Sequence, residues 1–137
     1  QLDVFGEVVD ALHPARLGGL RESPDAWALE RALVGRVAEV WKEPDEGIWE
    51  VRGPRQHFTH SKVMAWVAVD RAVRAVERHG LEGPVDAWRR LRDEIHADVC
   101  ARAWNARLGA FTQAYGSDRL DASLLLMPLV GFLPAHD

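Results

Sequence analysis

The chain has 137 residues, of which 47% are hydrophobic, and a formal net charge of -4 at pH 7. This composition is typical of one compact domain with a continuous core. Its fifteen arginines and two lysines are interleaved with acidic residues, so we expect neither nucleic acid nor an anionic membrane as a partner, and a ligand that is neutral or small.

Two amphipathic helices are predicted in the first forty residues. Over residues 2–17, apolar residues recur at spacings of three and four, as on one face of a helix, namely Leu2, Phe5, Val8, Val9 and Leu12. The Gly18-Gly19 pair is expected to end this helix. A second helix is predicted from Ser23-Pro24-Asp25, where serine or aspartate suits a cap and proline is tolerated in the first turn, to a point near Trp41.

A long loop is predicted after the second helix. Residues 43–55 contain two prolines, two glycines and six charged residues, and they show no helical period. Loops of this length inside compact domains are more often functional than decorative. The loop is therefore the first place to look for a site.

A third helix is predicted from about Ser61 to His79, with Thr59 and Ser61 as candidate caps. Its apolar residues extend almost all the way round, so we expect neighbours to bury it on several sides. Asp70 and Arg74 are four residues apart and are expected to pair across one turn, and Gly80 provides a stop.

The last third of the chain is predicted to hold two more helices. Pro84 opens an ordinary amphipathic helix, and residues 108–116 form at most a short strand. Asp121 is expected to cap a final helix, Ala122 to Phe132, that is buried on both sides. Five helices without a convincing sheet, alternating between apolar and amphipathic, favour an inner and an outer helical layer.

Three stretches of the chain resemble bacterial members of glycoside hydrolase family 15, which includes glucoamylases, glucodextranases and trehalases. The most specific is residues 43–70, EPDEGIWEVRGPRQHFTHSKVMAWVAVD, and the others are LDVFGEVVDAL near the start and LDASLLLMPLVGFLP near the end. The resemblance implies an all-α (α/α)6 toroid of six inner and six outer helices. Residues 1–137 would then be a contiguous, truncated segment of the catalytic domain.

The resemblance also implies a site on the long loop. In the family, the residue after the Ile-Trp pair is the general acid, which is Glu50 here, while Trp49 and Ile48 line the sugar subsite. The family's base is a glutamate on a later loop, so this chain would supply the acid and not the base. Glu50 lies between Trp49 and Val51, and we expect these neighbours to shield it partly from water. A second acid that fungal relatives carry is replaced by Val51.

The implied reaction is the hydrolysis of terminal α-glucosyl bonds with inversion, by direct attack of water. The main interpretation is a glucoamylase-like enzyme acting on a neutral α-glucan, and the alternative is a trehalase acting on a disaccharide. A third hypothesis, of another class, is a non-catalytic helical module that binds sugar or a partner. Because the base is missing, we expect the isolated chain to be inactive.

Each candidate residue also has a plainer interpretation. Glu50 would otherwise be a solvated loop acid, Trp49 a core residue like Trp27, Trp66 and Trp88, and Asp121 a helix cap. For Arg55, His57 and Lys62, as for Arg52, the choice is between binding sugar hydroxyls and positioning the loop. Glu43, Asp45 and Glu46 are possible second carboxylates for Glu50, but a solvated acidic turn is the favoured interpretation. His57 and His60 have a metal-like spacing, but without a third ligand nearby a capping or hydrogen-bonding role is favoured over metal binding.

The remaining expectations concern location and assembly. Cys100 is the only cysteine, which excludes an internal disulfide and favours a reducing, cytoplasmic location. The chain shows neither a secretory leader nor an apolar run long enough to span a membrane. We expect no cofactor. Because a cut toroid leaves inner helices without neighbours, we expect the fragment to self-associate.

Overall fold

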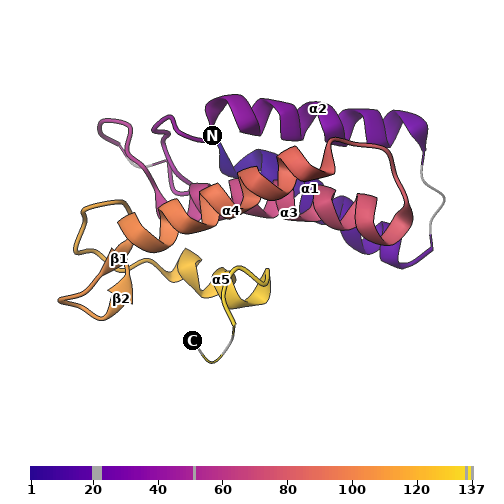
Figure 1. Ribbon diagram of the computed structural model, residues 1–137. Coiled ribbons are helices and arrows are strands. Elements are labelled where there is room, and N and C mark those ends of the chain that lie inside the picture. The colour runs from indigo at the N-terminus through magenta and orange to yellow at the C-terminus, as the bar shows by residue number, and fades with distance from the viewer. Residues whose placement is uncertain (20–22, 51, 135, 137) are drawn as a thin grey trace.

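The computed structural model describes residues 1–19, 23–50, 52–134 and 136, and it is mostly helical (Figure 1). The order of elements is α1 (Asp3–Leu17), α2 (Pro24–Val40), α3 (Thr59–His79), α4 (Val85–Arg102), β1 (Trp104–Asn105), β2 (Ala110–Phe111), the 3-10 helix η1 (Ala122–Leu125) and α5 (Leu126–Leu129). The predicted all-α class is confirmed. Four long helices make up most of the fold, as expected of part of a toroid.

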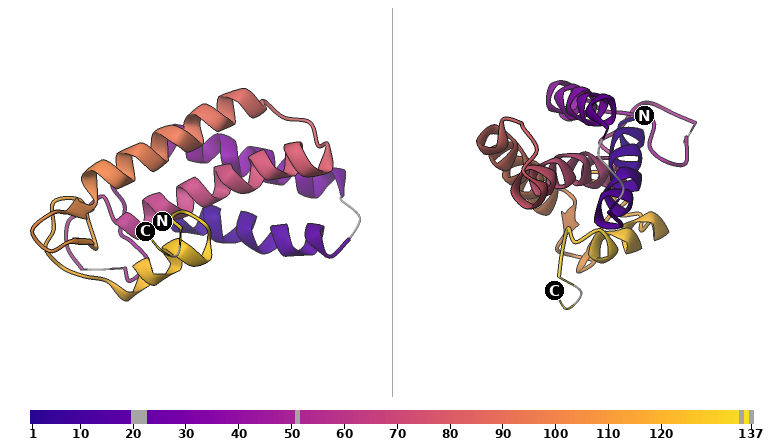
Figure 2. Two further views of the ribbon diagram at one scale, coloured as in Figure 1. Left: turned by 60° about the horizontal axis from the view of Figure 1, so that its bottom comes forward. Right: turned by 90° about the vertical axis from the view of Figure 1, so that its right-hand side faces the viewer.

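Helix α3 lies at the centre, between α1 and α4 and against α2 (Figure 2). It is built largely of valine and alanine, whose small side chains allow neighbours to approach from several sides, and it is buried almost continuously from Thr59 to Ala75. Trp27, Trp66 and Trp88 are core residues as predicted. Gly80 ends the helix in the left-handed conformation, with φ of +67°.

Helix α1 turns most of its predicted apolar stripe inward. Leu2 and Val9 are buried and Phe5 packs against the core, whereas Val8 is 39% exposed. The inward face also carries Gly6, His13 and Arg16. Gly6 allows α1 to approach α3 closely, since a Cβ there would lie 2.1 Å from the Met64 carbonyl oxygen. Contact between the two backbones therefore sets the rotation of α1.

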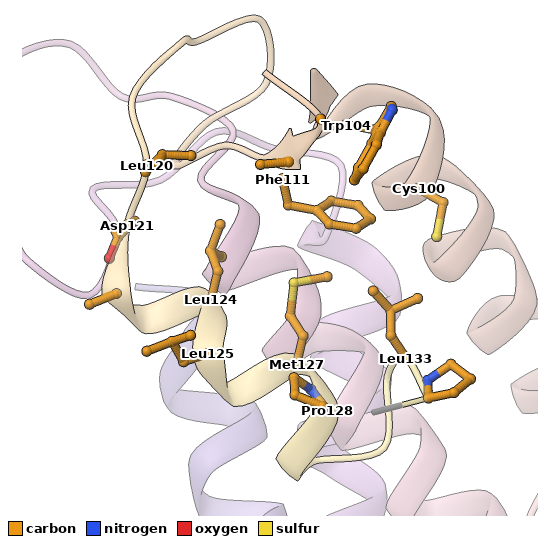
Figure 3. A pocket seen from close by; sticks show the side chains of 14 residues that line it. Cys100, Trp104, Phe111, Leu120, Asp121, Leu124, Leu125, Met127, Pro128 and Leu133 are labelled. Carbon is orange, nitrogen blue, oxygen red and sulfur yellow. The ribbon is translucent and has the colours of Figure 1, made fainter. Parts of the chain in front are cut away.

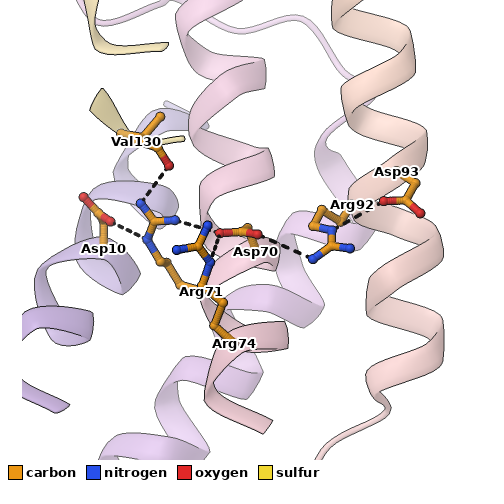
Figure 4. Close-up of polar contacts among 7 residues, drawn as sticks. All are labelled: Asp10, Asp70, Arg71, Arg74, Arg92, Asp93 and Val130. Atoms are coloured by element: carbon orange, nitrogen blue, oxygen red, sulfur yellow. Dashed lines mark hydrogen bonds and ion pairs between the residues drawn. The ribbon is translucent and has the colours of Figure 1, made fainter. Parts of the chain in front are cut away.

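A buried ion network ties three elements together (Figure 4). Asp70 of α3 pairs with Arg74 at 2.8 Å, as predicted, and with Arg71 at 2.7 Å. Arg71 also pairs with Asp10 of α1 at 2.7 Å and donates to the backbone carbonyl of Val130 at 3.0 Å. The guanidinium group of Arg71 thus anchors the C-terminal segment to α3.

The C-terminal segment differs most from the prediction. Residues 122–132 form a 3-10 helix and one turn of α-helix rather than a continuous helix, because Pro128 lacks the amide hydrogen that a longer helix needs. The prediction that this segment is buried on both sides is also wrong, since Leu125 and Leu129 are 75% and 81% exposed. The predicted cap is confirmed: the Asp121 carboxylate accepts from the Ser123 amide at 2.8 Å.

A small antiparallel hairpin occupies the stretch expected to hold at most a short strand. Strands β1 and β2 pair with Trp104 opposite Phe111 and Asn105 opposite Ala110. The chain then runs beside the start of α3, where Phe58 bridges to Ala114. As Figure 1 shows, the hairpin and the long loop lie at the same end of the helices.

Candidate active site

The loop between α2 and α3 is fastened at its base by a buried lysine. Lys62 is 1% exposed, and its ammonium group donates to the backbone carbonyls of Trp41 and, at 2.6 Å, Glu43. Burial lowers the pKa of Lys62 to about 8. These contacts hold the first residues of the loop against α3, so they match the loop-positioning interpretation of Lys62.

Asp45 is a second fastening point. Its backbone pairs with Gln56 across the loop, and its Oδ2 accepts from the Leu2 amide at 3.0 Å and from the Ser61 hydroxyl at 2.8 Å. The interpretation of Asp45 as part of a solvated turn is therefore wrong, because its hydrogen-bonding partners come from distant positions in the sequence. The two ends of the loop are therefore held together at Asp45 and Gln56.

The two residues predicted to cap α3 do not cap it. Helix α3 starts at Thr59 with Phe58 in the capping position and without a side-chain cap. The Thr59 hydroxyl donates instead to the backbone carbonyl of Thr112, and the Ser61 hydroxyl donates to Asp45. Both side chains connect α3 to neighbouring segments, which competes with local capping.

The tip of the loop is a tight turn that ends at Glu50. Gly47 adopts φ of +71°, and a Cβ there would lie 2.8 Å from the Phe58 ring. The Glu50 amide donates to the Gly47 carbonyl at 3.1 Å. Among the described residues Glu50 is the non-glycine residue with positive φ, +45°, a conformation that costs about 1–3 kcal/mol and is found preferentially at functional sites.

The Glu50 side chain lies on the surface. It is exposed, and its Oε1 accepts from the Gln1 side-chain amide at 2.7 Å. The expected shielding by neighbouring apolar residues is therefore not found on the Trp49 side, because Trp49 is itself 59% exposed. Val51, the other expected neighbour, lies outside the described residues. Ile48 is half-buried.

Trp49 is held by a carboxylate from the C-terminal segment. Its indole nitrogen donates to both carboxylate oxygens of Asp121, each at 3.0 Å. Asp121 also accepts from Gln113 at 3.2 Å and from the Ser123 amide. Burial alone would raise the pKa of Asp121, but these hydrogen bonds outweigh it and lower the pKa. The carboxylate is therefore ionised at neutral pH.

The other predicted site residues lie apart from this pair. Arg55 is exposed, pairs with Glu46 at 3.6 Å, and lines a polar hollow of about 310 Å³ together with Gln1. His57 and Lys62 line a different hollow, on the side of α4. The structure thus brings Trp49, Glu50, Gln1 and Asp121 to one end of the molecule but does not gather all predicted residues into one cavity.

His57 stacks on Tyr115, with ring centroids 5.7 Å apart and planes inclined by 18°. Burial, followed by the charges of Lys62 and Arg102, lowers the pKa of His57, so its ring is neutral at pH 7. His60 is 5% exposed in the first turn of α3. Within the described part of the chain, no three metal-binding side chains come together around these histidines or elsewhere.

An apolar hollow lies beside the hairpin and η1 (Figure 3). It measures about 840 Å³, and Figure 3 labels Trp104, Phe111, Leu124 and Met127 among its walls. Asp121 lies at the edge of this hollow and also accepts the hydrogen bond from Trp49. Its walls offer few polar groups for a sugar, so it is not the candidate site.

Some contacts at the loop tip could not be predicted from the sequence, namely those of Asp121, Gln113 and Gln1. Asp121 was recognisable as a cap, and its second role depends on a residue 72 positions away. Gln113 and Gln1 gave no signal, because an isolated glutamine in a loop has no characteristic spacing. A strained acid thus lies beside an exposed aromatic ring, on a loop at one end of packed helices. This arrangement is compatible with the carbohydrate-hydrolase class that the sequence resemblance implies.

Comparison with known proteins specifies that class. All 137 residues match the model of the glycosyl hydrolases family 15, and the chain belongs to this family. It is 46% identical to a trehalase of Mycolicibacterium smegmatis, 43% to a trehalase of Mycobacterium tuberculosis and 36% to a trehalase of Thermoplasma acidophilum, in each case over the whole chain. No solved structure gave a significant match.

The chain spans only part of these relatives. It covers 20% of the two mycobacterial trehalases and 24% of the Thermoplasma protein. The resemblance to family 15 seen in the sequence is confirmed. In the described part of the chain, none of the helices is both long and apolar enough to cross a membrane.

Proposed function

We propose that this chain is the acid-bearing segment of a family 15 trehalase. The observation that carries the proposal is the loop tip, where Glu50 adopts a strained backbone conformation next to the exposed ring of Trp49. Glu50 acts as the general acid and protonates the departing glycosidic oxygen. Trp49 offers an indole face to the apolar C–H side of a sugar ring.

The names of the relatives favour trehalose over a glucan. The three relatives compared above are each described as a trehalase, with identities of 36–46% over the full chain. This supports the trehalase alternative better than the glucoamylase-like interpretation. A neutral disaccharide also suits Trp49, because an indole face stacks on the apolar side of a sugar ring without needing a charged ligand.

The reaction that we propose is a single displacement. Water, activated by a base carboxylate, attacks the anomeric carbon from the face opposite to Glu50 while Glu50 gives its proton to the leaving oxygen. The nearby acids are engaged elsewhere: Asp45 holds Leu2 and Ser61, and Asp121 holds Trp49. We therefore place the base outside these 137 residues and expect residues 1–137 to be one segment of the catalytic domain.

The test is an assay of the full-length protein with trehalose and with maltose, followed by proton NMR in the first minutes. A trehalase hydrolyses trehalose in clear preference to maltose. Inversion releases one β-glucose from the attacked ring and one α-glucose from the leaving ring, so the two anomers appear initially in equal amounts. Faster hydrolysis of maltose would support a glucoamylase-like enzyme, and initial release of α-glucose alone would contradict inversion.

The exposed position of Glu50 also suits a second class of protein, a non-catalytic module that binds sugar. A loop that binds sugar without cleaving it would place an aromatic ring on the surface and would not need a second carboxylate. Binding of trehalose by the full-length protein, without any release of glucose, would favour this non-catalytic module.

A further inference from the structure

The contact between Trp49 and Asp121 joins two segments that are far apart in the sequence. Both carboxylate oxygens of Asp121 lie 3.0 Å from the indole nitrogen of Trp49. Trp49 is 59% exposed, so packing does little to fix its ring. A hydrogen bond to an ionised acceptor is stronger than a neutral one, and here it is the contact that orients the ring.

Asp121 is itself held in place from two sides. The Ser123 amide donates to Oδ1 at 2.8 Å, and the Gln113 side chain donates to Oδ2 at 3.2 Å. The backbone carbonyl of Gln113 in turn accepts from the amide of Thr59, the first residue of α3, at 2.9 Å. The central helix is thus connected through Gln113 and Asp121 to the ring of Trp49.

We infer that Asp121 is a positioning residue for the sugar site: it holds the Trp49 indole in the orientation in which the ring stacks on the substrate. The inference rests on the proposed function. A ring that is already fixed loses less rotational freedom when sugar binds, and this loss costs affinity. Removal of the contact is therefore expected to raise KM by about 2- to 10-fold, the range that the ordering of one side chain allows, with kcat little changed.

The experiment compares three variants of the full-length protein. Asp121→Ser keeps a side-chain oxygen that can cap η1 but is too short to reach Trp49. Trp49→Phe keeps an aromatic ring and loses the N–H donor, and the third variant combines both changes. Asp118→Ala is the matched control, because this exposed carboxylate of the same segment pairs with Arg107 on the surface.

Two measurements are made on each variant. The first is the fluorine NMR spectrum of protein labelled with 5-fluorotryptophan, in which the Trp49 signal is the one that Trp49→Phe removes. We expect Asp121→Ser to shift this signal and Asp118→Ala to leave it in place. The second is KM for trehalose, where we expect the double variant to be no worse than Trp49→Phe alone, because Asp121 acts through Trp49.

The two measurements separate failure of this inference from failure of the proposed function. An unshifted Trp49 signal in Asp121→Ser, or a double variant whose KM rises by the product of the two single effects, would overturn the positioning role. If the wild-type protein hydrolyses no trehalose, the proposed function fails, and the fluorine spectrum still decides whether Asp121 holds Trp49. Recovery of the wild-type signal position in Asp121→Asn, which keeps an acceptor at the same reach, would support the contact.

Discussion

At the scale of single residues, the conformation of the loop depends on charged side chains that point into the protein and not into solvent. Lys62 holds two backbone carbonyls at the base of the loop, and Asp45 holds the N-terminal segment and α3. Neither side chain is free to contact a sugar in this arrangement. Their role is to fix the turn from which Trp49 and Glu50 project, as a supporting shell does in other sites.

Lys62 leads to a prediction for alkaline pH. Burial lowers its pKa from the ordinary value of 10.5 to about 8, so the folded protein holds this proton more weakly than the unfolded chain. Below pH 8 both states carry the proton and folding bears the full cost of a buried ammonium. Between pH 8 and 10.5 the folded state releases it first, so the contribution of Lys62 to the free energy of unfolding rises with pH.

Chemical denaturation of the full-length protein between pH 7 and 10.5 measures this effect. The slope of stability against pH should be smaller in Lys62→Met than in the wild type. Lys42→Met, which changes an exposed lysine, serves as the control and should keep the wild-type slope. Equal slopes in Lys62→Met and wild type would show that Lys62 is not the group responsible.

At the scale of the elements, the close approach of α1 and α3 organises the fold. Gly6 allows this approach, since any Cβ would overlap the Met64 carbonyl. We expect Gly6→Ala to push the helices apart and to lower the free energy of unfolding by about 1–3 kcal/mol. Gly35→Ala in α2 is the matched control: nothing lies within 4 Å of its Cβ position, so it should stabilise the helix by about 0.5–1 kcal/mol. Thermal unfolding measures both, and a neutral Gly6→Ala would contradict the packing described.

The elements also show how far the sequence could be interpreted. The start of α2 and the end of α3 could be predicted from single residues. Pro24 fixes a backbone angle that suits the first turn of a helix, and Gly80 readily adopts the left-handed conformation that ends one. The apolar stripe of α1 could be predicted apart from Val8, whose exposure could not be foreseen because the close contact of Gly6 with α3 adjusts the rotation of the helix. In the site, the local motif predicts Trp49 and Glu50, whereas Asp121 and Gln1 reach them only through the folded chain.

At the scale of the whole molecule, apolar side chains remain uncovered. Leu125 and Leu129 of the C-terminal segment are 75% and 81% exposed, and Leu125 lines the apolar hollow. Exposed apolar surface of this kind is normally covered by protein. We therefore expect the isolated chain of 137 residues to self-associate.

Sedimentation velocity over a range of concentrations tests this expectation. The wild-type chain should sediment as dimers or larger species, and the combined change Leu125→Glu and Leu129→Glu should shift it toward monomer. Leu29→Glu, on the exposed face of α2 and 53% exposed in the wild type, is the comparison at a distant site. A wild-type chain that stays monomeric at all concentrations would show that this surface does not drive association.

The central claim is that Glu50 gives the proton to the leaving sugar. The most direct measurement is kcat/KM for trehalose of the full-length protein with Glu50→Gln. The control is Glu46→Gln, which changes an acid of the same loop that pairs with Arg55 at the surface. Loss of a general acid costs about 10²–10⁴-fold, so we predict a fall of this size for Glu50→Gln and less than a 2-fold change for Glu46→Gln. A Glu50→Gln protein that keeps wild-type kcat/KM would contradict the assignment.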